Sequence, residues 1–242
     1  IAIKNETSYS PDINALVKLG PSLKLSGDGP QVLIFHTHTT ESYTPTGEDS
    51  YAADENNRTL DNRYNVVRVG DEIEKVLKRN GINVVHITGS YFDYPSYTGS
   101  YTRSLEAVTR QLKKYPSIKV VLDIHRDAMI TSKGVKYKTV SKINGKSAAQ
   151  IMFVCGTDKG GLSHPDWRRN LAFDVTLQKA LLAKYPDIMR PINLRQARFN
   201  QHVSPCAALV EIGTSGNTLD EAVYSASLFA DTLSGILKKY RK

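Results

Sequence analysis

Two imidazoles and a carboxylate follow a short apolar segment near the start of the chain. Residues 32–35 are Val-Leu-Ile-Phe, which is typical of a strand buried on both faces, and His36, His38 and Glu41 lie within the six residues after it. In open α/β sheets, ligand sites lie beyond the carboxyl ends of the strands. Imidazole nitrogens and carboxylate oxygens are the ligands that zinc takes in hydrolytic sites, so this segment predicts part of a metal site.

Two later strand-like segments end in groups of the same kind. One is mostly apolar until His125, and the other is apolar until Glu211. A catalytic zinc is usually held by three protein ligands and keeps one position open for water. We therefore predict a site in which His36, Glu41 and His125 hold the metal. Glu211 is then the carboxylate that takes a proton from the water and passes it to a leaving amine.

Each of these residues has a structural alternative. His36 and His125 could instead be core histidines with satisfied hydrogen bonds, and Glu41 could cap a helix or lie on the surface. His38 shares a strand face with His36 by the two-residue period of a strand. It is therefore open to three roles: a metal ligand, a partner that orients a ligand, or neither.

Two arginines add further alternatives. Glu211 could form a buried ion pair with Arg126 or Arg195 instead of moving protons. Arg126 follows His125 directly. It is either a clamp for a substrate carboxylate or part of a structural ion pair.

Other catalytic and nucleotide-binding patterns are absent from the sequence. There is no Gly-x-Ser-x-Gly elbow of a serine hydrolase, no Gly-x-Gly-x-x-Gly or P-loop, and no His-Glu-x-x-His of a helix-based zinc protease. A metal site at the ends of strands remains.

The elements that must position these groups alternate between strands and helices. Helices are expected over 59–80, 104–114, 166–185 and from 218 onward, where Thr-Leu-Asp-Glu resembles a capping box. Strands are expected over 32–35, 82–87, 118–125, 148–155 and 207–211, with a hairpin around Asn144-Gly145 and a loop or edge strand in 189–202. This order predicts a three-layer α/β fold, with helices on both faces of a central, mostly parallel, twisted sheet.

We expect one catalytic domain over residues 30–242, preceded by an extension over 1–29 with a short helix in 11–19. The polar segment 44–58 follows the predicted ligands and is either a substrate-contacting loop or a plain surface loop. No apolar run approaches the ~18 residues of a membrane-spanning helix. The first residue is Ile1 rather than Met, so we expect a processed or truncated chain whose targeting segment lay upstream.

The net charge of +8 favours an anionic partner such as a bacterial wall polymer. The basic residues are scattered, without arginine-rich blocks, so nucleic-acid binding is not expected. The sequence has two cysteines, Cys155 and Cys206, which lack a zinc-finger spacing. We expect two buried thiols, with a disulfide between neighbouring strands as the alternative.

Taken together, three motifs resemble the stage II sporulation protein P family, which is related to the zinc-dependent N-acetylmuramoyl-L-alanine amidases. They lie in residues 32–43, 122–127 and 200–222, in the order expected of that family. The resemblance implies zinc ligands at His36, Glu41 and His125 and a catalytic glutamate at Glu211. It leaves the role of His38 open.

The resemblance also implies an activity and a setting. Members of the family are peptidoglycan hydrolases that cut the amide between N-acetylmuramic acid and L-alanine and have endopeptidase activity on cross-links. They act in engulfment during endospore formation, with the stage II sporulation proteins D and M as partners. An N-terminal anchor, absent from this sequence, holds them outside the cytoplasm at the sporulation septum and engulfing membrane. The alternatives are a catalytically weak wall-binding scaffold and a zinc hydrolase of another amide or ester.

Overall fold

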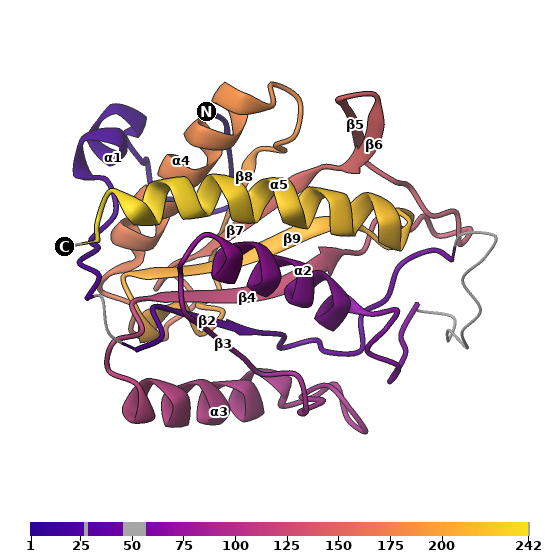
Figure 1. Cartoon of the computed structure of the whole chain (residues 1–242), viewed down its shortest axis with the longest axis horizontal. Helices are drawn as coiled ribbons and strands as arrows, with labels where there is room; N and C mark the ends of the chain where they lie inside the picture. Colours follow the sequence, from indigo (N-terminus) through magenta and orange to yellow (C-terminus); the bar gives the residue numbers. More distant parts are fainter. Residues whose placement is uncertain (27–28, 46–56, 242) are drawn as a thin grey trace.

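The computed structural model describes residues 1–26, 29–45 and 57–241, and its centre is a seven-stranded sheet with the order β1-β8-β7-β9-β4-β2-β3 (Figure 1). The strands of this sheet are β1 (Ile3–Asn5), β2 (Val32–Phe35), β3 (Val84–His86), β4 (Val120–Asp127), β7 (Ile151–Gly156), β8 (Ile192–Arg195) and β9 (Cys206–Thr214). The helices are α1 (Ile13–Leu19), α2 (Val66–Arg79), α3 (Ser100–Lys114), α4 (Trp167–Lys184) and α5 (Leu219–Lys238), with a short 3₁₀ helix η1 (Gln201–Val203).

Neighbouring strands in the sheet run parallel, except that β7 and β9 are antiparallel. All four residues of β2 are buried, as are all six of β7. Such continuous apolar runs are expected when helices cover both faces of a parallel sheet. The prediction of an α/β fold with a mostly parallel sheet is therefore confirmed.

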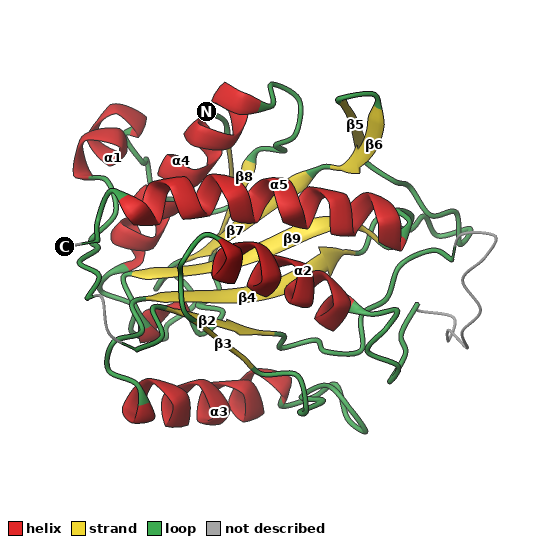
Figure 2. Ribbon diagram, viewed as in Figure 1, coloured by secondary structure: helices red, strands yellow, loops and turns green. Residues whose placement is uncertain are grey.

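The two faces of the sheet are covered unequally (Figure 2). Helices α2, α4 and α5 pack against one face and form the large apolar core with β2, β4, β7, β8 and β9. Helix α3 packs against the other face, where its Val108 belongs to one apolar cluster with Leu33 and Val121. Beyond α3 on that second face lies a small separate cluster of Met152, Val154 and Leu209, on β7 and β9.

Most of the expected elements form, with shifted boundaries. Helix α2 begins after its cap residue Asn65 rather than at residue 59. The capping box is present, because Thr218 and Glu221 bond each other's backbone at the start of α5. The expected hairpin is formed by β5 (Val140–Ile143) and β6 (Lys146–Ala149), with positive φ at both turn residues.

Two strands lie where the sequence did not place them. β8 is an interior strand, because β1 pairs with its outer edge. The first residues of the chain thus extend the sheet, while α1 packs against α4.

Both cysteines are free, buried thiols. Among the described helices, none is long and apolar enough to cross a membrane. Most of the predicted 44–58 loop lies outside the described residues.

Candidate metal centre

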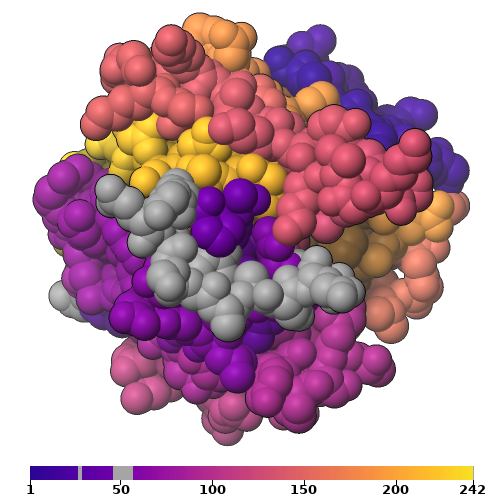
Figure 3. Space-filling model, turned by 90° about the vertical axis from the view of Figure 1, so that its right-hand side faces the viewer, coloured from indigo at the N-terminus to yellow at the C-terminus, as the bar shows by residue number. Residues whose placement is uncertain are grey.

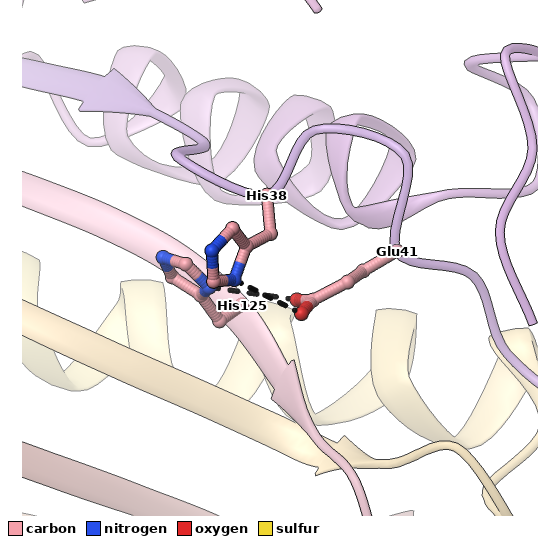
Figure 4. Close-up of side chains that lie close together, drawn as sticks. All are labelled: His38, Glu41 and His125. Atoms are coloured by element: carbon pink, nitrogen blue, oxygen red, sulfur yellow. Dashed lines mark ion pairs between the residues drawn. The ribbon is translucent and has the colours of Figure 1, made fainter. Parts of the chain in front are cut away.

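Three buried side chains from two parts of the chain meet at the carboxyl end of β4 (Figure 4). Nδ1 of His38 lies 3.3 Å from Oε1 of Glu41, and Nδ1 of His125 lies 3.4 Å from Oε2 of the same carboxylate. One ligand atom from each residue lies within 4.8 Å of the other two. Zinc–ligand bonds of about 2.0 Å in a tetrahedron put ligand atoms about 3.3 Å apart, so this donor set fits a zinc ion.

Backbone hydrogen bonds fold the segment after β2 so that His38 and Glu41 face the same way. The Glu41 N–H donates to the His38 carbonyl at 3.1 Å. Arg126 then fixes this segment to β4, because its backbone N–H donates to Glu41 and its guanidinium donates to the carbonyls of Ser42 and Asn57. The Arg126 guanidinium therefore has a structural role and does not act as a clamp for a substrate carboxylate.

Asp123, to which no sequence pattern assigned a role, orients His125. Oδ1 of Asp123 lies 2.8 Å from Nε2 of His125, and the same carboxylate accepts hydrogen bonds from the backbone and hydroxyl of Thr37. A carboxylate behind a metal-binding imidazole fixes its tautomer and leaves the other nitrogen for the metal. The available signal was an acid inside an otherwise apolar strand, two residues before His125 and therefore on the same face.

The ionisation of the cluster follows from burial and close charges. Burial works against the ionised form of Glu41, but hydrogen bonds from His125 and His38, with the charge of Arg126, hold its pKa well below the usual range. Burial also favours neutral His125, but the adjacent Asp123 carboxylate raises the pKa of that imidazole well above its ordinary value. Without a cation, a proton therefore occupies the position where His125 would bind a metal.

Glu211, the predicted proton carrier, lies beside the cluster because β4 and β9 are parallel neighbours that pair His125 with Glu211. Its Oε2 is buried and has no hydrogen-bond partner in the part of the chain that the structure describes. Burial raises the pKa of Glu211 to about 8; the charge of His125 opposes this shift, and the Glu41 and Asp127 carboxylates add to it. A carboxyl group with a pKa close to neutral can both accept and return a proton.

The structure does not bring His36 into the cluster, which corrects its assignment as a ligand. Its Nδ1 lies 2.9 Å from the carbonyl of Ile124, and its Nε2 lies 2.8 Å from Nε2 of His86. Both nitrogens are thus engaged on the α2 side of the sheet. β2 ends at Phe35, and the turn after it places His38, not His36, beside His125. Burial, with the nearby charge of His86, lowers the pKa of His36 to about 3.

The cluster opens into a cleft of about 260 Å³. On one side, the ring of Tyr97 stacks on His38 with centroids 4.5 Å apart, and Tyr101 meets the same imidazole edge-on. On the other side, the cleft runs over β9, β7 and β8, where it is lined by Met152, Val154, Leu209, Asn193, Arg195 and Phe199. Figure 3 looks onto this end of the molecule and shows violet, pink and yellow segments, from early, middle and late in the chain, side by side.

A family model described as Stage II sporulation protein P (SpoIIP) matches residues 2–234. The curated stage II sporulation protein P of Bacillus subtilis (strain 168) is 29% identical over 227 residues, which are 88% of this chain and 53% of that protein. The chain thus spans about half the length of this relative. Among solved structures, the N-acetylmuramoyl-L-alanine amidases AmiC2 of Nostoc punctiforme and Ami1 of Mycobacterium smegmatis are similar, at 14% and 13% identity. Their TM-scores are 0.48 and 0.49, and the alignments cover 88% and 90% of this chain and 98% and 100% of those chains.

Proposed function

Because the chain belongs to the stage II sporulation protein P family, we propose that it is a peptidoglycan hydrolase acting in sporulation. More specifically, we propose a zinc-dependent N-acetylmuramoyl-L-alanine amidase with additional endopeptidase activity on peptide cross-links. The proposal is supported above all by the cluster of His38, Glu41 and His125 beside the unpartnered carboxyl oxygen of Glu211, at the floor of an open cleft.

The three clustered side chains would hold zinc, and Asp123 would keep the His125 ring in position. Bound zinc would supply a Lewis acid for the scissile carbonyl and lower the pKa of a bound water towards ~7. Glu211 is placed to take the proton of the attacking water and to return it to the amine that leaves. The burial that holds its pKa near neutrality suits it for both transfers.

The cleft has a suitable surface for a peptide that carries carboxylates. Its floor beyond Glu211 is apolar and consists of Met152, Val154 and Leu209. At the far side lies Arg195, whose side chain is 45% exposed and pairs with Glu6 at 3.1 Å through one of its nitrogens. A guanidinium at the rim of an apolar floor can pair with the carboxylate of a stem peptide.

The setting of the reaction is also part of the proposal. Family membership suggests the stage II sporulation proteins D and M as partners. It also suggests a location outside the cytoplasm, at the sporulation septum and the engulfing membrane. The net charge of +8 would concentrate the protein near anionic wall polymers.

Digestion of purified peptidoglycan tests the activity. We expect the protein to release stem peptides, chelation to abolish the release, and added zinc to restore it. Mass analysis of the products separates amidase cuts, which free the L-alanine amino group, from endopeptidase cuts within cross-links. An unchanged product profile would instead support the wall-binding scaffold, and undiminished hydrolysis by metal-free protein would reject the zinc mechanism.

A further inference from the structure

A second group of potential ligands lies outside the cleft, between α2 and β3. It consists of Asp71 and Glu74, one turn apart on α2, and His86, the last residue of β3. The His86 side chain is only 2% exposed, whereas Glu74 is 23% and Asp71 49% exposed. The group therefore has a buried imidazole at its base and an open side through which an ion could enter.

Hydrogen bonds determine which nitrogen of His86 carries a proton. The carbonyl of Ile124 can only accept, so Nδ1 of His36 must donate to it, and Nε2 of neutral His36 carries a lone pair. Nε2 of His86 lies 2.8 Å from that lone pair and must therefore donate. In neutral His86 the remaining nitrogen, Nδ1, is then an acceptor.

That acceptor faces two carboxylates, with Nδ1 of His86 3.4 Å from Oδ1 of Asp71 and 3.2 Å from Oε2 of Glu74. Three acceptors at these distances repel one another unless a positive species lies among them, either a proton on His86 or a metal ion. The separations match those in the cluster of His38, Glu41 and His125, and they suit metal–ligand bonds of about 2.0 Å.

Packing holds the imidazole in this position. A Cβ at Gly70 would lie 2.6 Å from Nε2 of His86 and 2.8 Å from Cε1 of His36, so the two rings lie directly against the backbone of α2. The second oxygen of Glu74 pairs with the exposed Lys78 at 2.6 Å. The buried imidazole is thus positioned before any ion binds, which reduces the ordering that binding requires.

We propose that Asp71, Glu74 and His86 form a second divalent-cation site, which takes zinc and is distinct from the centre in the cleft. An imidazole with two carboxylates is a ligand set that zinc accepts, with water completing the shell on the exposed side. The ion ties α2 to β3. Through His86 and His36 it also supports the backbone at Ile124, next to His125, so its role is structural.

Zinc titration of the metal-free protein, with Zn²⁺ alone as the probe, tests this site. We expect wild type to bind two zinc ions per chain and the double variant Asp71→Asn/Glu74→Gln to bind one, with affinity at the altered site at least about tenfold weaker. A Glu41→Gln variant, which disables the cleft centre, should retain the second ion. Asp231→Asn is the matched control, because its side chain is also 49% exposed and ion-paired on a helix.

The outcomes are separable from those of the hydrolase proposal. Because the role is structural, zinc added beyond one equivalent should raise the melting temperature of wild type but not of the double variant, whether or not the protein cleaves peptidoglycan. Absence of bound zinc in a folded Glu41→Gln variant, or binding of two ions by a folded double variant, would overturn the proposal. The first result would identify His86 as a protonated member of an ion pair.

Discussion

His38 and His36 stand two residues apart and have different surroundings. Nε2 of His38 has no hydrogen-bond partner among the described residues, and its Nδ1 points at Glu41. Both nitrogens of His36 are engaged, with the Ile124 carbonyl and with His86. An imidazole whose Nδ1 faces the shared carboxylate of the cluster can bind a metal there, whereas an imidazole with both nitrogens engaged elsewhere is a structural group.

Zinc affinity of single-histidine variants checks this distinction. His38→Ala should weaken zinc binding in the cleft by more than about 100-fold, because it removes a direct ligand. His36→Gln should largely retain it. Both variants are best made together with Asp71→Asn and Glu74→Gln, so that only the cleft centre is measured. Equal losses in the two variants would contradict the assignment of His38.

Glu211→Gln separates metal binding from proton transfer. The amide keeps the size of the side chain but cannot take a proton, so kcat should fall by about 10²- to 10⁴-fold while the zinc content stays at the wild-type value. Peptide release and bound zinc are measured on the same preparation. Turnover at the wild-type rate would remove Glu211 from the proposed mechanism.

At the scale of elements, the packing of α4 on β7 buries an acid that plays no part in the site. Asp174 on α4 is 0% exposed. Burial raises its pKa well above the usual range, and the nearby Cys155 thiol opposes the shift only in part. The folded protein therefore holds this carboxyl group in its neutral form.

Stability should consequently depend on pH through Asp174. The pKa of Asp174 in the folded protein is raised above the unfolded value of about 4. The stabilising contribution of its neutral carboxyl group is therefore complete below pH ~4 and is lost as the pH rises towards the folded pKa. Asp174→Asn does not titrate. Its stability relative to wild type should therefore increase with pH, by up to about 1.4 kcal/mol per pH unit within that window. Urea unfolding at pH 5 and pH 8, with Asp231→Asn as an exposed control, measures this. A pH-independent difference would refute the prediction.

At the scale of the whole molecule, the unequal covering of the sheet creates the cleft. On one face, α3 covers β2 and β4 but leaves β9, β7 and β8 uncovered. On these uncovered strands, the cross-strand partners Leu209, Val154 and Asn193 lie in one row. The row leads from the metal centre on β4 towards Arg195. With strands about 4.8 Å apart, β8 lies about 14 Å from β4, which leaves room for several residues of a stem peptide.

Arg195→Ala should therefore affect substrate binding more than turnover. Loss of a half-exposed carboxylate contact should raise KM about three- to tenfold with little change in kcat. Arg169→Ala is the matched control, because its side chain is 51% exposed and ion-paired on α4. Steady-state kinetics on soluble muropeptides give both constants. An unchanged KM would show that the peptide does not reach β8.

The sequence alone determined the class of the protein and most of its chemistry. Local patterns of a few residues predict the α/β elements and the hairpin, through buried strand-like runs, capping signals and the Asn144-Gly145 turn. The polar groups at the ends of those runs likewise identify Glu41, His125 and Glu211 as candidate site residues. The place of β1 and the interior position of β8 do not, because strand pairing joins residues far apart in the chain.

Tertiary structure alone decided which histidine joins the cluster. β2 and β4 pair with Ile34 opposite Leu122, so His36 continues the face of Val32 and Ile34 towards α2, while His125 lies on the opposite face. A change of register by one residue would reverse this choice. Register is set by packing on both faces of the sheet, and no spacing within residues 32–43 contains that information.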